Sequence, residues 1–205
     1  MANLPTVALM QPTLIAKPFH REGWIYEEKV DGWRMGIYKA DRSVKLVSRQ
    51  GIDHTRRYPH IVAAIRAMSA PTIILDGEIA ICDQELISRF EWLRRRQPPG
   101  VATPPLFMAF DCLYHRGQDL RPRPLATRRN VLENVLDDQD LVLPVRRLAD
   151  NGLKAWQQVL ERGYEGLLAK DPASPYVGGR TLKWLKVKQR DYRVEERGWD
   201  SRNKS

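Results

Sequence analysis

Residues 27–34 read Glu-Glu-Lys-Val-Asp-Gly-Trp-Arg and join two extended runs, 24–29 and 33–39. An Asp-Gly pair between strand-like runs is a strong turn signal. The pair therefore predicts a strand, a turn and a second strand, with Lys29 at the end of the first strand, where its side chain can project into a cleft. By itself such a string is usually an ordinary turn with a solvated lysine, so the other segments decide its role.

Short extended runs dominate the rest of the chain. Strands are predicted at 24–29, 33–39, 44–48, 72–75, 78–82, 106–114, 141–145 and 182–187. Helical spacing marks 58–68, 125–136 and 153–162, where Gly163 can end the helix, and more weakly 88–96. Because the strands cluster as neighbouring hairpins and do not alternate regularly with helices, we predict the α+β class, with antiparallel β-sheets flanked by helices.

The sequence predicts a single domain. Its 205 residues, 42% of them hydrophobic, can bury a substantial core, and no repeat or Gly/Ser linker divides it. We expect one domain over 1–188, a proline-rich surface loop at 97–105 and a short basic mixed-charge tail at 189–205. Cys82 and Cys112 lie in apolar runs and are expected to be buried thiols.

Charge favours a polyanionic partner. Lys and Arg outnumber Asp and Glu by 34 to 25, which makes nucleic acid the first candidate, although many basic proteins bind none. No apolar run approaches the ~18 residues that span a bilayer, and no charged leader opens the chain. We therefore expect a soluble, cytoplasmic protein, monomeric and without a membrane partner.

A lysine nucleophile needs cations or burial around it. The amine attacks only when unprotonated, so its pKa must fall from an ordinary ~10.4. Arg34, Lys186 and Lys188 could supply the cations. Because Lys186 and Lys188 alternate with apolar residues, a strand would place both lysines on one face and the apolar pair against the core.

Residues 29–34 resemble the Lys-x-Asp-Gly-x-Arg signature of the nucleotidyltransferase superfamily, which comprises ATP-dependent DNA ligases, RNA ligases and mRNA capping enzymes. Further strings match in order: Ser-Arg-Gln-Gly at 48–51, Asp-Gly-Glu at 76–78, Phe-Met-Ala-Phe-Asp-Cys-Leu-Tyr at 107–114, Glu-Gly-Leu-Leu-Ala-Lys at 165–170 and Trp-Leu-Lys-Val-Lys at 184–188. The last two look more like bacterial and phage DNA ligases than capping enzymes. The resemblance implies the ATP-grasp-like adenylation fold, with a nucleotide cleft between two sheets.

The resemblance also implies a reaction. Lys29 would attack the α-phosphate of ATP and form a lysine-AMP bond; AMP would pass to a DNA 5′-phosphate, and a 3′-hydroxyl would displace it and seal the nick. The family positions that contact nucleotide correspond to Glu27, Arg34, Arg49, Glu78, Phe110, Glu165, Lys170, Lys186 and Lys188.

Individual roles follow from the same resemblance. Phe110 would stack on adenine, and Arg34 and Arg49 would contact ribose and phosphate. Glu78 and Glu165 would hold Mg²⁺. Glu27 would read the exocyclic amine of adenine, although Glu28 beside it keeps that assignment open. Nicked double-stranded DNA would be the partner.

The chain departs from the family pattern after Lys188. Family ligases continue into an OB-fold domain, and residues 189–205 are too few for a five-stranded barrel. A minimal enzyme, a subunit that borrows an OB fold from a separate partner, and an engineered fragment are the open explanations, with a complete product slightly favoured. RNA end joining and a non-catalytic nucleic-acid module are the alternative functions.

Overall fold

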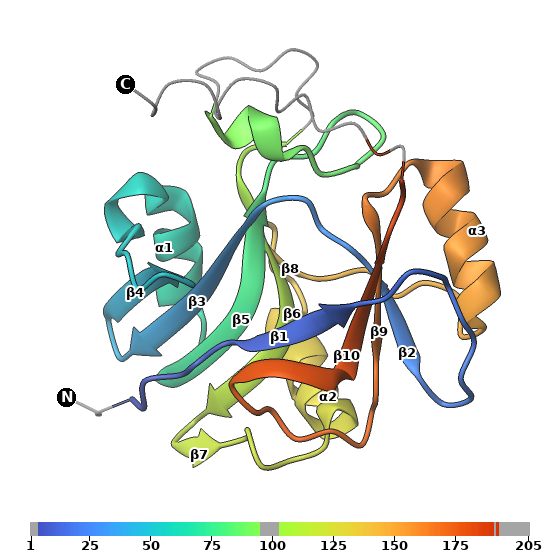
Figure 1. The fold of residues 1–205 in the computed structure, drawn as a ribbon. Helices are drawn as coiled ribbons and strands as arrows, with labels where there is room; N and C mark the ends of the chain where they lie inside the picture. Colours follow the sequence, from blue (N-terminus) through green and yellow to red (C-terminus); the bar gives the residue numbers. More distant parts are fainter. Residues whose placement is uncertain (1–3, 95–102, 191, 193–205) are drawn as a thin grey trace, which may run out of the picture.

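The computed structural model describes residues 4–94, 103–190 and 192. Two β-sheets face each other, with α-helices on their outer sides (Figure 1). Nearly all of the predicted tail at 189–205, and parts of the predicted proline-rich loop and fourth helix, lie outside the described residues. The α+β class predicted from the sequence is confirmed.

The smaller sheet has four strands in the order β1-β10-β9-β2. Their bounds are β1 Met10–Leu14, β10 Gly179–Lys188, β9 Gly166–Lys170 and β2 Ile25–Glu28. The helix α3, Gly152–Arg162, covers its outer face. Asn151 accepts hydrogen bonds from the first helical N–H groups, and Gly163 ends the helix in the left-handed conformation, at the residue predicted for it.

The larger sheet has the strand order β4-β3-β5-β6-β7, and β8 pairs with β6. Their bounds are β3 Trp33–Ala40, β4 Ser43–Ser48, β5 Thr72–Ala80, β6 Leu106–His115, β7 Gln118–Asp119 and β8 Val142–Pro144. The helices α1, Pro59–Ala67, and α2, Leu125–Leu136, pack apolar residues against its outer face.

Some sequence predictions were wrong in detail. The runs at 72–75 and 78–82 form one strand, β5, because Asp76 and Gly77 continue the pairing with β3. The sheets are mixed, since β1 pairs with β10 and β8 with β6 in parallel. The weak fourth helix contains a 3₁₀ segment, η2, at Phe90–Arg94, and another, η1, spans Thr55–Arg57.

Strand β1 was not predicted because it contains Pro12. Proline lacks the N–H that a central strand must donate, so a proline argues against a strand unless the strand lies at a sheet edge. Here β1 lies at the edge, and its register shifts between Pro12 and Thr13. Strands β9 and β7 were also missed; β9 is a short leucine-containing run whose strand identity depends on the two strands beside it.

Candidate active-site cleft

A cleft of about 240 Å³ opens between the two sheets. Both sheets line it: Gln11, Pro12, Glu27, Glu28, Lys29, Val30, Arg34, Arg49, Glu78, Phe110, Val145, Leu168, Lys170, Arg180, Trp184 and Lys186. Eight of the ten residues predicted for the nucleotide site are among them; of the other two, Glu165 contacts Lys29 and Lys188 contacts Glu165. The structure thus brings the whole predicted set together.

Strand alternation explains how the smaller sheet fills its side of the cleft. Trp184 and Lys186 of β10 pair with Lys170 and Leu168 of β9, and all four line the cleft. The residues between them, such as Val187, pack toward α3. The predicted split of this strand into a lysine face and an apolar face is therefore confirmed.

Lys29 forms part of a small cluster of charged side chains. Its Nζ contacts Glu165 Oε2, and the other oxygen of Glu165 lies 2.7 Å from Lys188 Nζ. The Lys29 backbone N–H donates to Gly166 O at 2.9 Å, which fixes this strand end beside β9. The Lys29 side chain is 18% exposed, so its amine can be reached from the cleft.

The close approach of β9 and β10 explains the glycine after Glu165. A Cβ at Gly166 would lie 2.0 Å from Val187 O and 3.0 Å from Lys188 Cα. We expect Gly166→Ala to lower the free energy of unfolding by about 1–3 kcal/mol, since the two strands must separate. Denaturant unfolding measures this. Gly163→Ala, which adds a methyl group at an ordinary contact distance of 3.9 Å from Ile87 but at φ +70, should cost about 1 kcal/mol; a larger loss there than in Gly166→Ala would contradict the packing argument.

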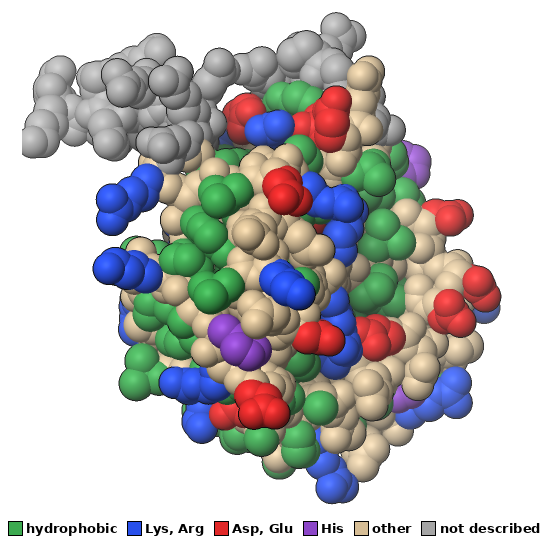
Figure 2. Space-filling view, turned by 90° about the vertical axis from the view of Figure 1, so that its right-hand side faces the viewer, with side chains coloured by type: hydrophobic (Ala, Val, Ile, Leu, Met, Phe, Trp, Pro, Cys, Tyr) green, Lys and Arg blue, Asp and Glu red, His purple; other side chains and the backbone are tan. Residues whose placement is uncertain are grey.

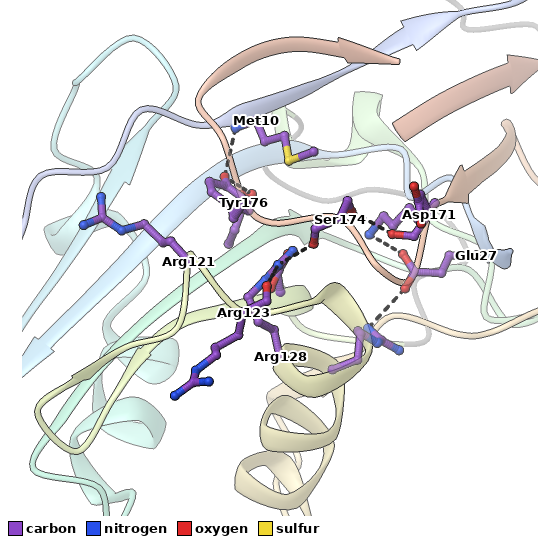
Figure 3. Close-up of polar contacts among 12 residues, drawn as sticks. Met10, Glu27, Arg121, Arg123, Arg128, Asp171, Ser174 and Tyr176 are labelled. Atoms are coloured by element: carbon purple, nitrogen blue, oxygen red, sulfur yellow. Dashed lines mark hydrogen bonds and ion pairs between the residues drawn. The ribbon is translucent and has the colours of Figure 1, made fainter. Parts of the chain in front are cut away.

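Arg34 and Glu78 come from paired positions of β3 and β5 on the larger sheet. Arg34 donates to both oxygens of Asp76, at 3.1 and 2.7 Å, and to Met10 O at 2.6 Å. Burial opposes the charged guanidinium, but the Asp76 carboxylate outweighs it and raises the pKa of Arg34. Tyr176 donates to the same carboxylate at 2.6 Å and accepts from Met10 N (Figure 3). Arg34 thus bonds to Asp76 of the larger sheet and to Met10 of the smaller one.

Glu78 lies among other acids. Burial, together with the charges of Glu165 and Asp31, raises the pKa of Glu78 to about 7 against the opposing effects of Lys29 and Arg34. Burial and the charge of Glu165 also raise the pKa of Asp31. This part of the cleft therefore concentrates negative charge that the neighbouring cations only partly balance.

The raised pKa of Glu78 predicts a pH dependence of stability. Between pH ~4.5 and about 7 the folded protein binds more protons at this group than the unfolded chain does, so this contribution to the free energy of unfolding falls as pH rises. Glu78→Gln should therefore gain stability relative to the unsubstituted protein from pH 5 to pH 8, measured by thermal unfolding. If the difference in melting temperature between Glu78→Gln and the unsubstituted protein is the same at pH 5 and pH 8, the raised pKa of Glu78 is contradicted.

Glu27 lies at the floor of the cleft, and its side chain is 1% exposed. Lys170 Nζ lies 2.5 Å from its Oε2, and Arg129 Nη1 lies 3.4 Å from its Oε1. Glu28, the next residue of β2, contacts Arg146 at 3.2 Å instead. Glu27 therefore pairs with a residue that lines the cleft, Lys170, whereas the partner of Glu28, Arg146, is not among the lining residues.

Two aromatic rings line the cleft together with Glu27. Phe110 and Trp184 meet edge to face, with ring centroids 6.2 Å apart. Lys170 Nζ lies 4.8 Å from the Phe110 ring centroid and 4.2 Å from that of Trp184. Burial lowers the pKa of Lys170, and the charge of Glu27 opposes that shift. Aromatic faces beside a polar floor suit a flat base that carries hydrogen-bond donors.

Sequence reasoning missed several residues of the site. Arg180 lines the cleft from the start of β10, and Gln11 lines it from β1. Arg180 lies an even number of positions before Trp184 and Lys186, so strand alternation could have found it. Nothing local marks Asp76 as the partner of Arg34, or Arg129 as the partner of Glu27, since both contacts depend on how the sheets and α2 pack.

Comparison with known proteins agrees with the geometry. The family model for the ATP-dependent DNA ligase domain matches residues 7–188. The chain belongs to this family. It is 33% identical over 178 residues to the multifunctional non-homologous end joining protein LigD of Pseudomonas aeruginosa, covering 86% of this chain and 21% of that protein. It is 30% identical to the SPbeta prophage-derived DNA ligase-like protein LigB of Bacillus subtilis, covering 87% of this chain and 66% of that protein.

Solved structures extend the family match to the fold. The structure described as mycobacterial DNA ligase D complexed with ATP and MES superposes with a TM-score of 0.77 at 29% identity, covering 89% of this chain and 60% of that one. The chain thus spans between about a fifth and about two thirds of the length of these ligase-family proteins. In the described ranges, none of the helices has the length and apolar character needed to cross a membrane.

Proposed function

We propose that residues 1–188 form the adenylation core of an ATP-dependent DNA ligase, in which Lys29 carries AMP. The observation that supports this most is the position of Lys29: its amine lies at a cleft whose floor suits a base and whose walls carry Arg34, Arg180 and Lys186. In the ligase family, that arrangement places a nucleophile beside the phosphate end of a bound nucleotide.

The proposed first step is a displacement at phosphorus. The neutral amine of Lys29 forms a bond to the α-phosphorus of ATP, the bond from that phosphorus to the bridging oxygen breaks, and pyrophosphate leaves with the electron pair; the nitrogen then releases one proton to solvent, which leaves a neutral phosphoramidate nitrogen. Fixed cations around the cleft stabilise the negative charge that develops on the phosphate oxygens. The second and third steps transfer AMP to a DNA 5′-phosphate and join the ends.

The floor of the cleft fits the adenine of ATP. Glu27 lines the cleft, and its Oε1 has no hydrogen-bond partner among the described residues, so the carboxylate keeps the capacity to accept a hydrogen bond from an amino group. Phe110 supplies an aromatic face beside it. A guanine would instead present a carbonyl oxygen to the carboxylate, which repels it. We therefore propose ATP as the nucleotide and Glu27 as the residue that reads it.

The carboxylates near Lys29 fit a magnesium ion. Glu78 and Glu165 present hard oxygen atoms, and a cation would offset the burial, and the smaller effect of the Glu165 charge, that raise the pKa of Glu78. Over residues 4–94 and 103–190, acids, histidines and cysteines do not group in threes around a metal position, so phosphate oxygens and waters would complete the shell. Bound there, Mg²⁺ would neutralise charge on the nucleotide phosphates.

Nicked duplex DNA is the proposed partner. A groove that adjoins the cleft shares Arg34, Arg49 and Glu78 with it, and Trp33 and Phe90 form part of its wall. This groove leads to Lys29 and suits the end of a strand. On the side of the molecule in Figure 2, basic, acidic and apolar side chains are interspersed, so charge alone does not mark a DNA surface there. A separate OB-fold partner and a monomeric state remain predictions.

Salt should weaken DNA binding. If the protein neutralises about four phosphates, its affinity for nicked duplex should fall about 100-fold between 50 and 200 mM salt, because condensed counterions are released on binding. Fluorescence anisotropy with labelled nicked DNA measures this. An affinity that does not change with salt would contradict binding through phosphate contacts.

The direct test is covalent labelling. The purified protein is incubated with ATP and Mg²⁺, its intact mass is measured, and nicked DNA with a 5′-phosphate is then added. We expect an AMP adduct and a joined strand. An adduct without joining would indicate a missing partner domain or an RNA substrate. No adduct, from folded protein that carries no AMP beforehand, would overturn the proposal and favour a binding module.

A further inference from the structure

Helix α2 presents two adjacent arginines that are both buried but have different partners. Arg128 is 0% exposed and makes a two-point contact with Asp111, at 2.8 Å for each oxygen. It also donates to Ser174 O at 2.9 Å (Figure 3). These contacts tie α2 to β6 and to the segment after β9, away from the cleft floor. Arg128 therefore has a structural role.

Arg129 is turned toward the cleft floor. It is 1% exposed, and its Nη1 lies 3.4 Å from Glu27 Oε1. Its Nη2 donates to Val145 O at 3.2 Å, and Val145 itself lines the cleft. Glu133, one helical turn later, lies 3.2 Å from the same guanidinium. Arg129 thus connects α2 to two parts of the floor.

The contacts of Glu27 are unequal. Its Oε2 lies 2.5 Å from Lys170 Nζ, and its Oε1 lies farther from its cation, 3.4 Å from Arg129 Nη1. Arg129 Nε and Nη1 have no hydrogen-bond partner among the described residues. A buried carboxylate keeps its charge only where cations compensate it, and Lys170 and Arg129 lie on its two sides. The charge of Arg129 therefore holds Oε1 in place, and this oxygen can still accept a hydrogen bond.

We propose that Arg129 is a positioning residue for nucleotide selection: from α2 it holds the ionised Glu27 carboxylate in the orientation in which it accepts a hydrogen bond from the amino group of an adenine in the cleft. This inference rests on the proposed function, and it concerns which base the site accepts. Arg129 does not touch the nucleotide. It acts by fixing the orientation and charge of the residue that does.

The test compares ATP with purine riboside 5′-triphosphate, which differs only in lacking the exocyclic amine. Dissociation constants are measured in a Lys29→Ala background, so that no covalent adduct forms. The parent should prefer ATP by about tenfold or more, as expected for a hydrogen bond to a charged group. Arg129→Met should reduce that preference to about twofold or less, and Arg129→Lys, which keeps the charge, should retain more of it.

Arg128→Met is the matched control, because it makes the same change at an equally buried neighbour. It should lower thermal stability and leave the ATP preference at the parent value. Glu27→Gln should remove the preference, and adding Arg129→Met to it should change the ratio no further. The readout is the ratio of the affinities of one variant for the two nucleotides. A general loosening of the fold weakens both affinities alike and therefore leaves this ratio unchanged.

The outcomes separate this inference from the proposed function. If the parent binds neither nucleotide, the proposed function fails and the inference fails with it. If the parent prefers ATP but Arg129→Met keeps that preference, or Arg128→Met loses it equally, Arg129 is only structural and the inference is overturned. If Arg129→Met does not fold, the same comparison is made between Arg129→Lys and Arg128→Lys. A loss of the preference for ATP over purine riboside 5′-triphosphate in Arg129→Lys alone supports the inference, and an equal preference in the two variants overturns it.

Discussion

Lys29→Ala should lower covalent AMP labelling to background, a loss of at least about 1,000-fold, because the variant lacks the nucleophile and no neighbouring lysine has its position. The fold should persist, since Lys188 still lies 2.7 Å from the Glu165 carboxylate that Lys29 also contacts. Intact mass after incubation with ATP and Mg²⁺ is the measurement, and circular dichroism with thermal unfolding checks the fold.

Two variants control for charge and for lysine content. Lys29→Arg keeps a cation beside Glu165 but replaces the amine with a guanidinium that stays protonated, so it should also remain unlabelled. Lys17→Ala removes an exposed lysine remote in sequence from every matched string and should be labelled like the unsubstituted protein. Persistent labelling of Lys29→Ala would show that another residue carries AMP.

Arg128→Met should produce the largest loss of stability among the ion-pair substitutions. It leaves Asp111, itself 0% exposed, without the guanidinium that holds both of its oxygens. Removing one partner of a buried pair costs about 3–5 kcal/mol, which for a domain of this size lowers the melting temperature by about 10 °C. Thermal and denaturant unfolding measure the loss.

Arg121→Met is the comparison for Arg128→Met. Arg121 also makes a two-point contact with an aspartate, Asp119, but the side chains of that pair are 31% and 38% exposed. Water replaces the lost contact there, so the cost should stay below about 1 kcal/mol. Equal losses in the two variants would show that burial does not decide the strength of these pairs. The double variant Arg128→Met/Asp111→Leu should recover much of the loss.

The sequence alone located much of the fold and the proposed site. Six short strings in a fixed order indicated the family, and the match over residues 7–188 confirmed it. The helices predicted at 58–68, 125–136 and 153–162 were found within a few residues, because each has its own apolar period and end signals. Alternation within 184–188 was enough to place Lys186 on the cleft side of β10, since the period of a strand is a local property.

Only the tertiary structure decided which groups meet across the molecule. Lys29 and Glu165 are 136 positions apart in the chain, and Asp76 and Tyr176 are 100 apart. Neither contact leaves a local pattern, and the same holds for Arg129 beside Glu27 and for the parallel pairing of β1 with β10. Propensity and periodicity act over a few residues, whereas these contacts follow from the packing of two sheets and α2. The sequence therefore determined the family, the residue proposed as nucleophile and the strand faces, and the packed structure determined the partners that orient them.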